Sequence, residues 1–193
     1  MLCYQTGRNG GNSQLGEDAV TEPELLLETR RFRVIRQRHL TPDGVEHVRD
    51  TVQHPGAVTV LPMVDDDHVC LIRNYRVAID QYLIELPAGT LEPGEAPETT
   101  AHRELEEETG YRAKHVEKLS AFSMSPGILN ERMHLYLATG LTPGPTQLDA
   151  GEQIENLVVP WEEAIAMAQD GRIQDSKSLV ALLLYDKIRG GPK

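Results

Sequence analysis

The chain carries two hydrophobic patterns, one typical of strands and one typical of helices. Up to about residue 90, apolar and polar side chains alternate or form short β-branched runs, separated by the turn signals "TPDG" and "DDDH". Two further extended segments follow in the second half. We therefore expect strands over residues 30–40, 45–52, 56–64, 69–77, 81–89, 115–123 and 132–138.

Helical periodicity occurs only in the second half of the chain. The first predicted helix begins near Pro97, which suits the first helical position because its missing N–H would have no partner there. It ends at Gly110, because glycine is a common C-terminal cap of a helix. Two amphipathic helices are predicted over 161–171 and 175–190, the second with Asp175 as its N-cap.

The 193 residues have the length of one globular domain, with 39% apolar and 25% charged residues. Residues 1–20 are rich in Gly, Asn, Gln and Ser without periodicity, so we expect a flexible tail there. We divide the remainder into an N-terminal β region, 21–55, and a main domain, 56–193.

The charge of the chain limits its partners. A formal net charge of −11 disfavours nucleic acid, because binding a phosphate backbone needs a Lys/Arg surface. The apolar runs are too short to span a bilayer, and the first thirty residues lack a signal-peptide pattern. We therefore expect a cytoplasmic protein with no nucleic-acid or membrane partner.

The predicted helix at 97–110 carries an unusual density of carboxylates. At about 100° per residue, Glu104, Glu107 and Glu108 share one stripe, whereas Glu106 points away and is interpreted as a solvated residue. Like charges at this spacing cost roughly 0.2–0.5 kcal/mol per pair. Oxygen-rich sites of this kind suit hard divalent cations such as Mg²⁺ or Mn²⁺. The stripe is thus a candidate metal site.

The residues around this stripe resemble the Nudix box. From Gly89, a Glu follows after five residues and "RELEEETG" after seven more, which fills each fixed position at its spacing; Tyr111 is a loose match to the final aliphatic position. The pieces "HPGAV", "RNYR", "ELPAG", "SPG" and "GEQIE" are similar in order to the ADP-ribose pyrophosphatase branch. The resemblance implies an α/β fold, an α/β/α sandwich around a mixed sheet. For this branch it also implies a homodimer that exchanges N-terminal strands.

The resemblance also implies the chemistry. Members of this branch split a nucleoside diphosphate sugar, here ADP-ribose, into AMP and ribose 5-phosphate with Mg²⁺, for which Mn²⁺ is a possible substitute. The metal ligands would be Glu104, Glu107, Glu108 and the carbonyl of Ala88.

Further roles come from the same resemblance. Glu152 is the first choice for the general base, with Glu131 and Glu107 as rivals. Arg103 and Glu95 would tie the loop to the helix through charge-assisted hydrogen bonds. The segment 145–156 has the composition of a mobile loop that could close over substrate.

The substrate would be held by a few cations and backbone groups. Arg76 matches an arginine that contacts the diphosphate, and Arg49 could reach the active site of a partner subunit. The turn at Gly127 would receive the terminal ribose, and Phe32 is the only obvious aromatic candidate in the N-terminal hairpin for adenine.

Two alternatives remain open at this point. One is a hydrolase of another nucleoside diphosphate sugar, of the GDP-mannose type, or of a dinucleotide. The other is a non-catalytic ADP-ribose sensor that regulates a partner. The intact carboxylate set argues against the sensor, because non-catalytic relatives usually lose these carboxylates. Only an assay with several substrates would distinguish the two kinds of enzyme.

Overall fold

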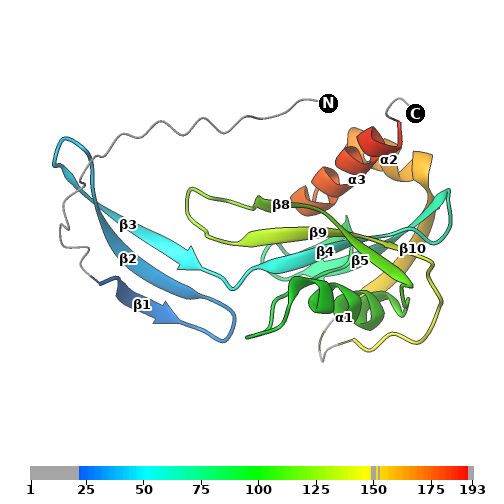
Figure 1. Cartoon of the computed structure of the whole chain (residues 1–193), viewed down its shortest axis with the longest axis horizontal. Helices are drawn as coiled ribbons and strands as arrows, with labels where there is room; N and C mark the ends of the chain where they lie inside the picture. Colours follow the sequence, from blue (N-terminus) through cyan, green and yellow to red (C-terminus); the bar gives the residue numbers. More distant parts are fainter. Residues whose placement is uncertain (1–21, 149–150, 152, 191–193) are drawn as a thin grey trace, which may run out of the picture.

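A computed structural model describes residues 22–148, 151 and 153–190 of the chain. Strands occupy most of the first half and helices follow later in the chain (Figure 1). The elements are β1 (Glu24–Glu28), β2 (Arg33–Leu40), β3 (Glu46–Gln53), β4 (Ala57–Pro62), β5 (His68–Arg76), β6 (Gln81–Glu85), β7 (Ala88–Thr90), α1 (Pro97–Thr109), β8 (His115–Ser123), β9 (Arg132–Thr139), β10 (Ile154–Pro160), α2 (Trp161–Asp170) and α3 (Ser176–Arg189).

The strands form three sheets. β1, β2 and β3 make an N-terminal antiparallel sheet that extends away from the rest of the molecule (Figure 1). β7, β4, β9 and β8 make a mixed sheet in that order, in which β4 and β9 run parallel. β10, β5 and β6 make a third, antiparallel sheet.

Helices cover both sides of the second and third sheets, with α1 on one side and α2 and α3 on the other (Figure 1). Alternate residues of β4 belong to two hydrophobic clusters, one on each face of the sheet, because successive side chains of a strand point to opposite faces. Val58 and Val60 pack with Ala101 and Leu105 of α1, while Leu61 belongs to the cluster under α2 and α3. The predicted α/β/α sandwich around a mixed sheet is therefore confirmed.

The ends of the helices follow the local signals. Pro97 occupies the first turn of α1, and Gly110 ends it with φ of 75°, a left-handed conformation that glycine adopts without steric cost. Asp175 caps α3 by accepting a hydrogen bond from the backbone N–H of Ser178 at 3.0 Å. These predictions of helix position are confirmed.

The strand predicted over 81–89, with Pro87 and Gly89 as its end signals, is confirmed as far as residue 85 and wrong beyond it. The segment divides into β6 and β7, which belong to different sheets. Pro87 has no N–H to continue a ladder, and the N–H of Leu86 donates instead to the Ser178 hydroxyl at 2.7 Å. The chain thus leaves one sheet at residue 85 and enters the other at residue 88.

Other differences lie at the ends of predicted loops. Extended structure begins at Glu24, in β1, earlier than the expected start at Arg30. Residues 154–156, expected in a mobile loop, pair with β5 as the start of β10. The predicted tail, 1–20, lies outside the described residues. Within the described part of the chain, no helix has the length and apolar character needed to cross a membrane.

Candidate active site

The candidate site lies where α1 meets the edge strand β7. Leu105 of α1 is fully buried, and this anchors the helix on the sheet. The predicted stripe lies beside that buried face: the side chains of Glu104 and Glu107 are 13% and 39% exposed, and Glu108 is 4% exposed. Glu108 is therefore a buried carboxylate close to the sheet, and Glu107 is the outermost of the three.

The register of β7 directs Ala88 toward this helix. Val60 and Leu91 donate backbone hydrogen bonds to Pro87 and Gly56, so the ladder with β4 uses residues 87, 89 and 91. The backbone groups of Ala88 and Thr90 consequently point to the opposite edge. There, the N–H of Ala88 donates to Oε2 of Glu108 at 2.8 Å.

Gly89 allows the strand and the helix to approach closely. A Cβ atom at this position would lie 1.8 Å from the carboxyl carbon of Glu104, a distance that only the absence of a side chain permits. The carboxylate of Glu104 thus rests against the strand backbone, beside the residue whose carbonyl was predicted to be a ligand.

Arg103 organises the acidic residues around it. Its guanidinium donates to Glu95 through Nε at 3.2 Å and Nη2 at 3.1 Å, and its Nη1 donates to Glu104 at 2.7 Å and to Glu107 at 3.0 Å. The hydrogen bond to Glu95 is the main reason that the pKa of Arg103 is raised, and it lowers the pKa of Glu95. This confirms the contact between Arg103 and Glu95 expected from the sequence.

The donor set fits a hard divalent cation in chemistry but is not arranged as a closed ligand cage. No cluster of three or more His, Cys, Asp or Glu within the described residues has metal-binding geometry. Instead, Glu104 and Glu107 turn toward Arg103, and Glu108 accepts from Ala88. The Glu104 carboxylate itself fills the space that Gly89 leaves, and the carboxylate oxygens of the stripe are the ligand type that a hard divalent cation takes.

The segment after β9 and the strand β10 both contact the last turn of α1. The backbone N–H of Gln147 donates to the carbonyl of Glu107 at 2.8 Å, and Nδ2 of Asn156 donates to the carbonyl of Thr109 at 2.7 Å. These contacts satisfy carbonyls that a helix end leaves without partners. Sequence reasoning did not find them, because neither a loop N–H nor an asparagine on a strand signals which helix it will contact.

Arg76 lies at the end of β5, and its guanidinium is engaged by a buried acid. Nε and Nη2 donate to the two carboxylate oxygens of Glu85, at 2.8 and 2.5 Å, and Glu85 is fully buried. This pairing is the main reason that the pKa of Arg76 is raised, and the negative charge of Glu108 adds to the shift. The principal partner of Arg76 is therefore Glu85, and Glu108 is the member of the carboxylate stripe whose charge reaches it.

The remaining predicted residues lie in other parts of the structure. Arg49 projects from β3 and donates to the carbonyl of Val48, and Oε1 of Glu131 lies 3.6 Å from Nδ1 of His54. Among the hydrogen bonds and ion pairs of the described residues, those of the Arg49 and Glu131 side chains do not involve α1. Gly127 is exposed in the turn before β9. Glu152 lies outside the described residues.

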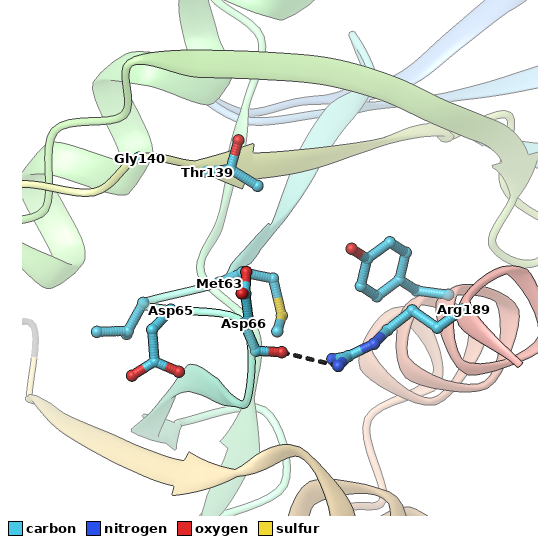
Figure 2. A pocket seen from close by; sticks show the side chains of 8 residues that line it. Met63, Asp65, Asp66, Thr139, Gly140 and Arg189 are labelled. Carbon is cyan, nitrogen blue, oxygen red and sulfur yellow. Dashed lines mark hydrogen bonds between the residues drawn. The ribbon is translucent and has the colours of Figure 1, made fainter.

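Two cavities accompany these elements. One, of about 280 Å³, lies between the β1–β2 turn and the start of β4, and its lining includes Phe32, Arg33 and His54. The larger, of about 380 Å³, lies beside α3, where Arg189 donates to the carbonyl of Asp66 at 2.7 Å (Figure 2). None of the predicted site residues that the structure describes lines the larger cavity, so size alone does not locate the chemistry.

Comparison with known proteins gives a consistent picture. The model described as "NUDIX domain" matches residues 53–182. The chain is 40% identical over 143 residues to an ADP-ribose pyrophosphatase of Bacillus subtilis (strain 168), covering 73% of this chain and 77% of that protein. It is 39% identical over 171 residues to a methanol dehydrogenase activator of Bacillus methanolicus, covering 88% and 92%. The crystal structure of an ADP compounds hydrolase superposes with a TM-score of 0.78 at 27% identity, covering 90% of this chain and 94% of that one.

Proposed function

The chain belongs to the Nudix family, and from that premise we propose that it hydrolyses the diphosphate bond of ADP-ribose to AMP and ribose 5-phosphate with the help of Mg²⁺, or Mn²⁺ in its place. The observation that carries this proposal is the contact between α1 and β7. There, Glu104 lies against the backbone of Gly89 and Glu108 accepts from Ala88. The identity to an ADP-ribose pyrophosphatase supports the choice of substrate.

The proposed metal ligands are Glu104, Glu107, Glu108 and the carbonyl of Ala88. A divalent cation held there would supply positive charge that neutralises the diphosphate and promotes ionisation of the attacking water. Glu108 is oriented for this role by the Ala88 N–H, and Arg103 fixes Glu104 and Glu107 from the outer side of the stripe. Arg103 and Glu95 thus set the positions of the ligands.

Glu152 is the proposed general base, which takes a proton from the attacking water. Glu107 and Glu131 are the alternatives, and Glu107 has the advantage of lying on α1 itself. Arg76 would bind the diphosphate oxygens, since its side chain is 39% exposed even though Glu85 holds one of its edges. Gly127 would contact the terminal ribose through its backbone.

We place the base of the nucleotide at the cavity that includes Phe32. Aromatic and arginine side chains stack on purines, and Phe32 and Arg33 are both available on its wall. In a single chain this cavity lies at the base of the N-terminal sheet. Binding of the nucleotide base there would make this sheet part of the substrate-binding site.

We further propose a homodimer formed through the N-terminal sheet. Leu25 and Leu27 of β1 are 52% and 50% exposed, and Val48 of β3 is 44% exposed, although the sheet extends away from the chain's own core. Apolar side chains on such a sheet need a covering surface. A second copy would cover them and would bring Arg49 toward the partner's active site. The cytoplasmic location expected from the sequence stays a prediction.

The experiment that tests the proposed function is product analysis. Incubation with ADP-ribose and Mg²⁺ should yield AMP and ribose 5-phosphate in equal amounts, and chelation with EDTA should abolish both. A parallel panel of GDP-mannose and a flavin dinucleotide separates the alternative substrates by kcat/KM. Absence of AMP with any divalent cation at neutral or alkaline pH would exclude ADP-ribose hydrolysis.

A second class of function is favoured by one specific observation. The relative from Bacillus methanolicus is named as the activator of another enzyme. Regulation of a partner by a non-catalytic sensor would leave ADP-ribose bound and intact. Binding of ADP-ribose without turnover, measured by calorimetry and product analysis together, would support the sensor and contradict the hydrolase.

A further inference from the structure

A buried charge network lies behind Arg76 and includes residues from α3. Glu85 accepts from Arg76 on both carboxylate oxygens, and its Oε2 also accepts from Nζ of Lys177 at 2.6 Å. Lys177 is 6% exposed and lies 2.9 Å from Asp175, the residue that caps α3. Glu85 and Lys177 are thus buried together, and Arg76 forms the partly exposed end of the network.

Enclosing charges in this way is costly unless each is paired. Burial alone would raise the pKa of Glu85, but the hydrogen bonds and charges of Arg76 and Lys177 outweigh it and hold that pKa below its ordinary value. Glu85 is therefore a carboxylate, not a neutral acid, in the folded chain. Removing either cation would leave a buried negative charge with a single partner.

The network also fixes the position of Glu85. The hydroxyl of Ser178 accepts from the N–H of Leu86 at 2.7 Å and donates to Asp175, so the first turn of α3 holds the backbone next to Glu85. Lys177 holds the carboxylate of Glu85 from the same turn. Two independent contacts from α3 therefore determine the position of the acid that binds Arg76.

The way Glu85 binds Arg76 leaves one side of the guanidinium available. A guanidinium has five N–H donors, and the bidentate contact uses the Nε–H and one N–H of Nη2. The Nη1–Nη2 edge therefore faces away from Glu85, on a side chain that is 39% exposed. This edge has the fork geometry that suits two phosphate oxygens.

We propose that Lys177 is a positioning residue for diphosphate binding, which holds Glu85 so that Arg76 presents its Nη1–Nη2 edge to the substrate. The proposal rests on the proposed function, because it requires that Arg76 contact the diphosphate. Lys177 itself does not touch substrate. It acts through Glu85, and its loss would let Glu85 and Arg76 move together away from the required orientation.

The test is a double-mutant cycle between Lys177→Met and Arg76→Met, read by kcat and KM for ADP-ribose. In the otherwise native chain, Lys177→Met should lower kcat/KM on the order of tenfold, mainly by raising KM. In the Arg76→Met background, the same change should cause no further loss. Equal losses in both backgrounds, or no loss in the native one, would overturn the proposal.

Two further variants distinguish a positioning role of Lys177 from a general effect of charge and from a loss of folding. Lys187→Met, on the exposed last turn of α3, removes the same charge and should leave KM unchanged. If Lys177→Met does not fold, Lys177→Gln keeps a donor for Glu85 without the charge and enters the same cycle. Failure of both to fold would overturn the proposal, since Lys177 would then be required for folding.

Binding of inorganic pyrophosphate distinguishes failure of this inference from failure of the proposed function. Calorimetry with pyrophosphate and Mg²⁺ should give a dissociation constant that rises with Lys177→Met by the same factor as KM. Native protein that does not hydrolyse ADP-ribose would refute the proposed function, while the pyrophosphate titration would still decide the role of Lys177. An unchanged pyrophosphate affinity in Lys177→Met would overturn that role.

Discussion

The backbone N–H of Ala88 donates a hydrogen bond of 2.8 Å to Oε2 of Glu108, across a separation of 20 residues. This contact joins the outer edge of β7 to the buried end of the carboxylate stripe on α1. Because the same edge carries the carbonyl of Ala88, one short strand positions a carboxylate and offers a further oxygen. The candidate metal site is thus built from a strand edge and a helix face.

We predict that Gly89→Ala disrupts the site without unfolding the chain. The new methyl group would meet the carboxylate of Glu104 at 1.8 Å, so that side chain must turn away from β7. We expect metal-dependent turnover to fall about 10–100-fold, the range seen when groups that orient ligands are lost. Steady-state kinetics with a Mg²⁺ titration measures it.

Gly190→Ala is the matched control for that substitution. Gly190 follows α3 with φ of −84°, and a methyl group there would meet only the Asp186 carbonyl at 3.3 Å. Its turnover should equal that of the native chain. Native kinetics in Gly89→Ala would show that the close approach of β7 and α1 has no part in catalysis.

We predict that Arg103→Met destabilises the metal-free protein by about 1–3 kcal/mol, because three acids lose a shared partner in a partly buried site. Arg112→Met should cost about 0.5 kcal/mol or less, since the Arg112 side chain is 66% exposed and pairs with Glu106 at the surface. Urea unfolding in EDTA compares the two. Equal losses would indicate that Arg103 acts as an ordinary surface residue.

The cost of Arg103→Met should also depend on pH. Arg103 lowers the pKa of Glu95 in the folded state, so this contribution is complete above the unfolded value, about 4.3 for Glu, and is lost as pH falls through the folded value. The difference in unfolding free energy between native and variant should therefore be largest near neutral pH and shrink below about pH 4. A difference independent of pH would contradict this assignment.

We predict that Glu152→Gln lowers kcat more than Glu131→Gln does. A general base typically contributes about 10²–10⁴-fold, and its loss leaves substrate and metal binding in place. Glu131 lies 3.6 Å from His54, so its replacement should act mainly on that contact. The pH dependence of kcat in both variants is the measurement. A larger loss of kcat in Glu131→Gln than in Glu152→Gln would indicate that Glu131 is the general base.

We predict that the double variant Leu25→Glu and Leu27→Glu shifts the homodimer toward monomer. Charges at these exposed positions of β1 would oppose burial against a second copy. Light scattering after size exclusion gives the mass of native and variant protein. Val77→Glu, at a position 81% exposed outside that sheet, is the control and should keep the native mass. A monomeric native chain would contradict the proposed dimer.

Local signals in the sequence located most of the fold. The limits of α1 followed from Pro97 and Gly110, and the strand patterns located β2, β3, β4 and β5 because each is a local property of spacing. Pro87 gave a local signal that the strand ends, but the passage of the chain into a second sheet was missed, since it also involves a partner 92 residues away, the Ser178 hydroxyl that binds Leu86. Sheet membership is a tertiary property that a nine-residue pattern does not contain.

For the candidate site, the sequence predicted the carboxylate stripe but not all of the ion pairs around it. Helical spacing placed Glu104, Glu107 and Glu108 on one stripe and excluded Glu106, which pairs with Arg112 instead. Lys177 was not found as a partner of Glu85. A Glu within the apolar run "YLIELPAG" does signal a buried charge that needs a cation. Which cation supplies the pair depends on how α3 packs, and the sequence pattern does not show that.

Manganese titration tests the central claim most directly, namely that the α1 carboxylates hold a divalent cation. Calorimetry should detect Mn²⁺ binding to the native chain, weakened about tenfold or more in Glu104→Gln, Glu107→Gln and Glu108→Gln. Glu106→Gln, on the same helix but off the stripe, should bind as the native chain does. Absence of Mn²⁺ affinity in the native chain, or native affinity in Glu108→Gln, would contradict the account.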